Sequence, residues 1–359
     1  MAGNRISRRH FLRESLFFSS LALAYPSKIW LPETSFQKDS PEKYGSGRVS
    51  GHSLRQKVEH EPSYLTLHRS GELATRVREL KTMYENCRLC PRDCRVDRTK
   101  GQKGKCQASA SVKVSSVNPH FGEERPLVGR FGSGTVFFSN CGLRCIYCQN
   151  YSISIEGEGV EISDRRLAES MIALQKMGCH NINLVTPTHY LPNIVNALVL
   201  AIPEGLKIPL VYNTSGYERL EILQLLEGII DIYLPDCKYM DPEMAAKYSE
   251  EAYNYPHYAK IALIEMNRQV GSLKTERGVA IKGLMIRHLI LPNRISGAEK
   301  FLKFVADKFP KDTYVNIMGQ YRPEHKAFDC PELARRLKRN EFTETLRWAK
   351  KYGVTRLAR

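Results

Sequence analysis

Apolar residues recur along this chain in two alternating rhythms, which predict strands and helices in turn. Short runs rich in β-branched and aromatic residues predict six buried strands, at residues 132–139, 181–186, 208–213, 229–234, 284–291 and 314–318. Between them, apolar residues at helical spacing predict helices at residues 164–176, 192–201, 217–226, 242–249, 255–273 and 298–309. Six β–α units in succession predict an α/β fold with a parallel sheet and helices on its outer face.

The two flanks of the chain do not follow this alternation. Residues 64–84 have helical spacing and should pack on the main domain, whereas residues 32–62 have few apolar side chains and read as a linker. A basic stretch from Arg335 onward predicts C-terminal helices with a solvated basic face. We expect a linker and packing helix over 32–84, a Cys-rich metal-binding segment over 85–112, the main domain over 113–325 and basic helices over 326–359.

Composition is that of a folded enzyme-sized chain with an unusual charge. Its 359 residues are 42% hydrophobic, which is enough to bury a sizeable core. The formal net charge of +16 favours acidic partners. Basic runs are not interleaved with aromatic residues and no nucleic-acid-binding motif is present, so a nucleic-acid-binding module is the least favoured function class. We expect a monomer.

Three cysteines follow the first predicted strand within one short loop. Cys141, Cys145 and Cys148 have the spacing C-x3-C-x2-C, which supplies three thiolates. A four-iron cluster needs a terminal ligand on each iron, so three thiolates would leave one iron open to a small molecule. Structural zinc sites take four ligands, usually as two close pairs. Three unrelated buried thiols are the alternative without a metal.

This motif resembles that of the radical S-adenosylmethionine (SAM) enzymes, with an aromatic residue, Tyr147, before the last cysteine. The segment from His120 to Glu124, the Gly-Ser-Gly-Thr strand and the Gln-Asn after Cys148 are similar to the branch related to pyruvate formate-lyase activating enzyme. The resemblance covers about residues 85–325. It implies a partial parallel (βα)6 barrel, a [4Fe–4S] cluster held by the three cysteines, and SAM on the open iron.

Polar residues follow the ends of successive predicted strands, where a parallel barrel places its site. These strand-end residues are Thr186, Thr188, His189, Asn213, Thr214, Ser215, Asp236, Lys238, Arg287, Gln320 and Tyr321. Each could instead cap a helix or complete a turn. From this set and the cysteine loop, the resemblance takes as cofactor-binding candidates Tyr147, Thr186, Asn213, Ser215, Asp236, Lys238 and Arg287.

Two candidates depart from the family pattern. Thr186-Pro-Thr188 stands where activating enzymes have Gly-Gly-Glu, and Asn213 replaces their acidic residue. By the resemblance, Tyr147 would lie near the adenine, Lys238 is the candidate partner of the SAM carboxylate, and Arg287 is a second contact.

The resemblance implies reductive cleavage of SAM to a 5′-deoxyadenosyl radical that takes hydrogen from a substrate. A reductant such as flavodoxin or ferredoxin would supply the electron, and a glycine of a partner protein is the candidate substrate. The alternative function is a non-catalytic iron–sulfur electron carrier. Carriers normally saturate every iron with protein ligands, which the three-thiolate loop does not.

A second cysteine set precedes the main domain, with the spacing C-x2-C-x3-C-x11-C at Cys87, Cys90, Cys94 and Cys106. Four thiolates suit a structural zinc ion or a second iron–sulfur cluster, and disulfides are a third option. Cys179, Cys237 and Cys330 are isolated, and we interpret them as core thiols.

The N-terminus resembles a twin-arginine export signal. Arg8 and Arg9 precede a modest apolar stretch over residues 16–24, and Ala22-Leu23-Ala24 is a cleavage candidate. The stretch is too short to span a bilayer, and an ordinary basic amphipathic arm is the alternative. A signal over 1–31 implies passage through the Tat translocon to the periplasm or cell envelope. The cytoplasmic supply of SAM favours the cytoplasm instead.

Overall fold

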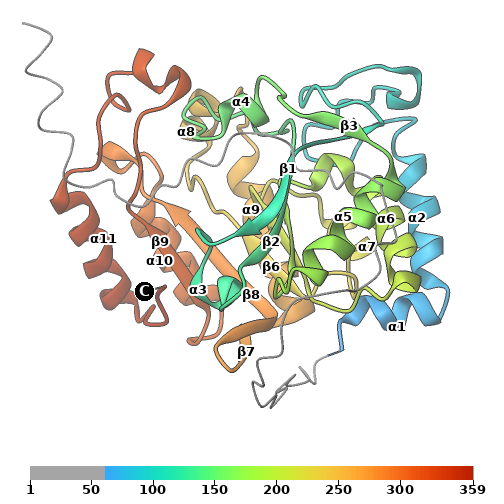
Figure 1. Ribbon diagram of the computed structural model, residues 1–359. Coiled ribbons are helices and arrows are strands. Elements are labelled where there is room, and N and C mark those ends of the chain that lie inside the picture. Colours follow the sequence, from blue (N-terminus) through green and yellow to red (C-terminus); the bar gives the residue numbers. More distant parts are fainter. Residues whose placement is uncertain (1–60, 359) are drawn as a thin grey trace, which may run out of the picture.

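The structure is a computed structural model that describes residues 61–358. Its central element is a parallel sheet in the order β2, β4, β5, β6, β8, β9. The strands are β2 (Ser133–Phe138), β4 (Ile182–Val185), β5 (Leu210–Thr214), β6 (Ile232–Pro235), β8 (Val279–Leu289) and β9 (Tyr314–Met318). All six predicted strands are therefore present and pair in sequence order, as in a partial (βα) barrel (Figure 1).

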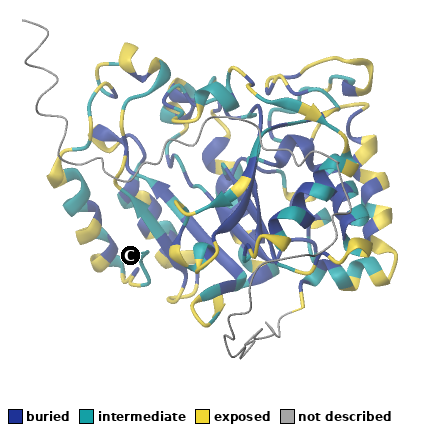
Figure 2. Ribbon diagram, viewed as in Figure 1, coloured by how far each residue is buried: buried dark blue, intermediate teal, exposed yellow. Residues whose placement is uncertain are grey.

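Helices follow these strands as the periodicity predicts. They are α5 (Asp164–Lys176), α6 (Leu191–Ala201), α7 (Leu220–Leu225), α8 (Pro242–Tyr248), α9 (Tyr255–Val270) and α10 (Ala298–Lys308). The local sequence fixes several of their first residues. Ser163 caps α5 by accepting a hydrogen bond from the Arg166 N–H, and Asp241 caps α8 in the same way. Figure 2 shows the central parallel strands largely buried and the helices with one exposed side, so the main core lies between sheet and helices.

Three further strands were not predicted. β1 (Val112–His120) runs antiparallel to β2 and carries β3 (Val160–Ile162) on its other edge, while β7 (Lys274–Glu276) pairs with the start of β8. Because the β7–β8 pair extends through a tight turn, β8 begins at Val279 rather than at residue 284. β1 lies beside the first parallel strand and leads into the short helix α3 (Arg125–Val128), which packs against β8 (Figure 1).

The flanking helices differ in extent from the prediction. Residues 64–84 form two helices, α1 (Ser63–Arg69) and α2 (Glu72–Thr82), because Gly71 takes a left-handed conformation between them. α2 packs against α6, as expected. At the other end, α11 (Arg339–Tyr352) begins four residues later than the basic stretch, and it packs against α10. The remaining short helix is α4 (Tyr151–Ser154).

The predicted export signal, residues 1–31, and nearly all of the predicted linker lie outside the described residues. Between residues 61 and 358, none of the helices has both the length and the apolar character needed to cross a membrane.

Candidate active site

A cavity of about 620 Å³ opens inside the partial barrel. Its volume is within the range of about 300–1,000 Å³ that is usual for ligand pockets. One wall is the loop after β2, with Cys141, Cys145 and Cys148, and the others are the carboxyl ends of β4, β5, β6, β8 and β9. The cavity therefore lies where a parallel barrel places its ligands.

Each cysteine sulfur of this loop has a hydrogen-bond partner. The Leu143 N–H donates to Cys141 Sγ at 3.4 Å, the Ser249 hydroxyl donates to Cys145 Sγ at 3.1 Å, and Ser154 Oγ lies 3.1 Å from Cys148 Sγ. Such donors stabilise a thiolate, and in iron–sulfur proteins they tune the reduction potential. Ser249 follows α8, so the loop is supported by a residue more than a hundred positions along the chain.

As free thiols, Cys141 and Cys145 are protonated at neutral pH. Burial raises the pKa of Cys145 to about 11, although the nearby Lys238 ammonium opposes this shift, and burial also raises the pKa of Cys141. A bound metal would have to displace these protons. Within residues 61–358, no three His, Cys, Asp or Glu side chains are placed to hold a single metal ion. A four-iron core carries its thiolates on different irons, so its ligands need not converge on one point.

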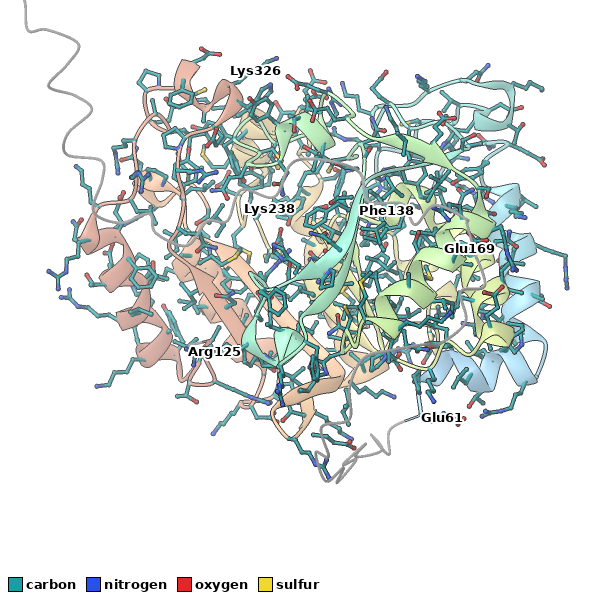
Figure 3. The ribbon with its side chains drawn as sticks, in the orientation of Figure 1. Glu61, Arg125, Phe138, Glu169, Lys238 and Lys326 are labelled. Atoms are coloured by element: carbon teal, nitrogen blue, oxygen red, sulfur yellow. The ribbon has the colours of Figure 1, made fainter. Side chains whose placement is uncertain are left out.

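A charged network lies beside the cysteine loop. Asp236 accepts from Lys238 Nζ at 2.7 Å and from Arg287 Nε at 2.7 Å, and Arg287 Nη2 donates to Asn213 Oδ1 at 2.6 Å. Burial alone would raise the pKa of Asp236, but Arg287 and Lys238 outweigh it and lower that pKa. The cavity therefore holds a carboxylate with two cations at neutral pH. Figure 3 labels Lys238 near the centre of the molecule in this view.

All seven predicted cofactor-binding residues line this one cavity. They are Tyr147, Thr186, Asn213, Ser215, Asp236, Lys238 and Arg287. The Tyr147 ring is buried and meets the rings of Tyr239 and Tyr321 edge-on. Gly216, after Ser215, has a positive φ of 74° and lies against the Asp236 carbonyl, where no side chain would fit. The roles of the seven toward SAM stay predictions.

Three other strand-end residues do not line the cavity, so the prediction was wrong for them. The Thr188 hydroxyl donates to Glu218 at 2.7 Å, His189 Nε2 contacts the Ser139 carbonyl at 2.7 Å, and the Tyr321 hydroxyl donates to Leu333 O at 2.8 Å. Each side chain is buried and instead bonds to a residue at least 12 positions away in the sequence, so these contacts are neither local turns nor helix caps.

Sequence reasoning missed the part of the cavity wall formed by residues 120–125. His120 Nδ1 lies 3.1 Å from Glu123 Oε1, Glu123 reaches Arg287 at 3.9 Å, and the Asn316 amide donates to Glu124 at 2.9 Å. Burial would raise the pKa of Glu123, but His120 and Arg287 lower it. In the sequence, the two adjacent glutamates were the feature that could have pointed to this part of the wall. Their location at the cavity could not be predicted because strand β1, which leads into them, was not predicted.

The buried carboxyl group of Glu218 was also missed. It accepts hydrogen bonds from the hydroxyl groups of Thr188, Thr214 and Tyr212, and only 1% of the residue is exposed. Burial raises its pKa to about 7 despite these donors. The hydrogen bonds of Glu218 thus connect the turn after β4 with the end of β5, where Thr214 lines the cavity.

The other cysteines are free thiols, as are the three of the loop, so the disulfide alternative is wrong in this structure. Cys179 and Cys237 are buried core thiols, as predicted, but Cys330 is only partly buried. Cys87 and Cys106 are buried, Cys90 and Cys94 are partly buried, and Cys90 Sγ lies beside Gly142 in the loop that holds Cys141.

A sequence model of the radical SAM superfamily matches residues 135–271, which include Cys141, Cys145 and Cys148. The uncharacterized protein MJ0674 of Methanocaldococcus jannaschii is 32% identical over 292 residues, which cover 79% of each chain. The chain belongs to the radical SAM superfamily. Enzymes of this superfamily use a [4Fe–4S] cluster and SAM for radical chemistry.

Two more distant similarities accompany these matches. The uncharacterized protein MJ0808 of the same archaeon is 23% identical over 273 residues, 68% of this chain and 73% of that protein. The crystal structure of methylornithine synthase (PylB) superposes with a TM-score of 0.39 and 18% identity, covering 59% of this chain and 60% of that one.

Proposed function

We propose that this radical SAM protein is an enzyme that takes a hydrogen atom from a substrate bound in the barrel cavity. The observation that carries the proposal is the presence of three thiols and a Lys–Asp–Arg network on the walls of the same cavity. A non-catalytic electron carrier has no need of an open, charged cavity beside its cluster, because its irons are saturated by protein ligands.

The residues present fit the cofactors of the superfamily. Cys141, Cys145 and Cys148 would hold the cluster as thiolates, and the Ser249 and Ser154 hydroxyls would then donate to the sulfurs. When bound and reduced, the cluster supplies the electron that splits SAM into methionine and the hydrogen-abstracting 5′-deoxyadenosyl group.

The charged network would orient SAM. Lys238 is the proposed partner of the SAM carboxylate, and Asp236 fixes the lysine by the 2.7 Å ion pair. Arg287 would be a second contact to the same ligand. Asp236 and Asn213 hold the guanidinium group of Arg287 from two sides, which limits its freedom before any ligand binds. Tyr147 would lie near the adenine.

For the substrate, we keep the glycine Cα of a partner protein as the finer proposal, with a flavodoxin or ferredoxin as reductant. The resemblance of residues 120–124 and 148–150 to the activating-enzyme branch supports it. Export through the twin-arginine route, with the cytoplasm as the alternative site of action, is likewise a proposal that rests on residues 1–31. Mixing the loaded enzyme with a candidate glycyl-radical enzyme of the same genome should give a glycyl EPR doublet. A genome without such an enzyme would rule this substrate out.

The experiment that tests the enzyme class is anaerobic reconstitution with iron and sulfide, reduction, addition of SAM and measurement of 5′-deoxyadenosine. We expect product from the parent protein and none from Cys145→Ala. Cys330→Ala is the matched control, because Cys330 is a partly buried thiol that does not line the cavity. Loss of product in both variants, or no product from a fully loaded and reduced parent, would contradict the proposal.

A further inference from the structure

The second cysteine set lies next to the first loop, where Cys90 Sγ packs against Gly142. The Lys105 N–H donates to Cys94 Sγ at 3.3 Å, so Cys94 lies beside the residue that precedes Cys106. The backbone closes around them, since the Cys87 N–H donates to Val96 O and the Arg95 N–H donates to Cys87 O, both at 2.9 Å. These backbone contacts fold the segment back on itself and hold Cys87 beside residues 95 and 96.

A buried cation lies beside this group without a carboxylate partner. Arg98 is 1% exposed, and its guanidinium group donates to the carbonyls of His189 and Ser109 and approaches Cys87 Sγ at 4.0 Å. The group lies over the Tyr84 ring at 4.2 Å. Its Nε has no hydrogen-bond partner, and no acidic side chain of residues 61–358 forms an ion pair with it. A buried, unpaired charge is costly, so this environment calls for a nearby anion.

Neutral thiols cannot supply that anion, but metal-bound thiolates can. We infer that Cys87, Cys90, Cys94 and Cys106 bind a metal as thiolates, and that the negative charge of this centre balances Arg98. Four thiolates leave both a zinc ion and a four-iron cluster with net negative charge. The sulfurs do not converge on one point, so zinc would require the side chains to rotate inward, whereas an iron–sulfur core would accept a wider spacing.

This centre would also brace the loop that holds the first cluster. Cys90 Sγ packs against Gly142, where an added Cβ would lie only 3.3 Å from the sulfur. Arg92, two residues later, donates to Gly142 O at 2.8 Å and Leu143 O at 3.1 Å, and also to Ser249 O at 2.8 Å. The segment of the second set thus joins the two stretches of backbone that position Cys141 and Cys145.

Metal analysis of the full chain tests the inference. The protein is produced with iron and zinc both supplied, purified without oxygen and compared with a variant in which Cys141, Cys145 and Cys148 are all replaced by serine. We expect this variant to keep one metal centre, seen as about four irons with acid-labile sulfide or as about one zinc. If the triple variant fails to fold, native mass spectrometry of the parent gives the number of metal centres instead. A parent that carries a single centre, lost entirely in the triple variant, would overturn the inference.

Arg98→Met tests the charge balance separately. If the thiols bind metal, loss of the guanidinium should weaken metal retention against a chelator by about 10- to 100-fold, as for other groups that support metal ligands. Arg88→Met is the matched control, because Arg88 is exposed in the same segment. If the thiols stay neutral, removing an unpaired buried cation should leave metal content unchanged and raise the melting temperature, and that result would refute the proposed role of Arg98.

Discussion

The buried carboxyl group of Glu218 predicts how the stability of the folded chain depends on pH. Its carboxyl group is buried against the hydroxyl groups of Thr188, Thr214 and Tyr212, and burial raises its pKa to about 7 from 4.5. The acid is protonated in the folded chain over a pH range in which it ionises in the unfolded chain. The unfolded state therefore binds fewer protons there, and stability should fall as pH rises from 4.5 through 7.

The size of the effect follows from the pKa difference. One pKa unit corresponds to about 1.4 kcal/mol, so ionisation of this buried carboxyl costs the folded state about 3 kcal/mol above neutral pH. Glu218→Gln keeps an acceptor for the threonines and stays neutral. The free energy of unfolding of this variant, relative to the parent, should thus rise by about 2 to 3 kcal/mol from about pH 5 to about pH 8.

Urea unfolding of the full chain at several pH values, without oxygen, measures this difference. Glu79→Gln is the matched control, because Glu79 is exposed on α2 and its variant should track the parent at every pH. A parent-to-variant difference for Glu218→Gln that stays flat across this range would refute the reasoning. It would mean that the carboxyl is ionised and fully compensated, or that it is not buried.

Two further predictions concern the cluster and SAM. Ser249→Ala removes the hydrogen-bond donor to Cys145 Sγ. Because a hydrogen bond to a charged group is worth about 1.5–3 kcal/mol, the reduction potential of the cluster should fall by tens of millivolts in an EPR-monitored redox titration. An unchanged or higher potential would contradict this prediction. Lys238→Met should weaken SAM binding about 10- to 100-fold in equilibrium dialysis with cluster-loaded protein. Lys247→Met is the control and should leave SAM binding unchanged, because Lys247 is exposed and paired with Glu332. Equal affinities of the two variants would exclude Lys238 as the partner of the SAM carboxylate.

The parallel part of the fold was predictable because its strands are buried on both faces. Runs such as 229–234 are apolar except for Asp231, and the helices between them have regular spacing with clear caps such as Ser163. β1 escaped prediction because its residues are half-buried and mixed in polarity. The short edge strands β3 and β7 depend on pairing with β1 and β8, which local sequence does not reveal.

Much of the candidate site was predictable for a different reason. Residues at the carboxyl ends of parallel strands, or directly after them, reach one end of the barrel whatever the details of packing, so Thr186, Asn213 and Asp236 all line the cavity. One or two positions further along, the chain has already turned. Thr188 and His189 lie in a turn at the start of α6, and their side chains point into the core. The rule therefore holds at the strand ends and as far along as Lys238 after β6, but it fails after β4, where the chain enters this turn at once.

The cysteine loop shows what spacing alone leaves out. C-x3-C-x2-C determines which thiols can reach one cluster, but the shape of the loop depends on residues that the motif does not contain. Arg92 binds the loop carbonyls from one side, and Ser249 joins Cys145 to the chain after α8. Both partners come from segments distant in sequence, and Arg92 belongs to the segment of the second cysteine set. A change in that set should consequently reach the first loop through Arg92, so the two sets are best treated as one structural unit in any mutational study.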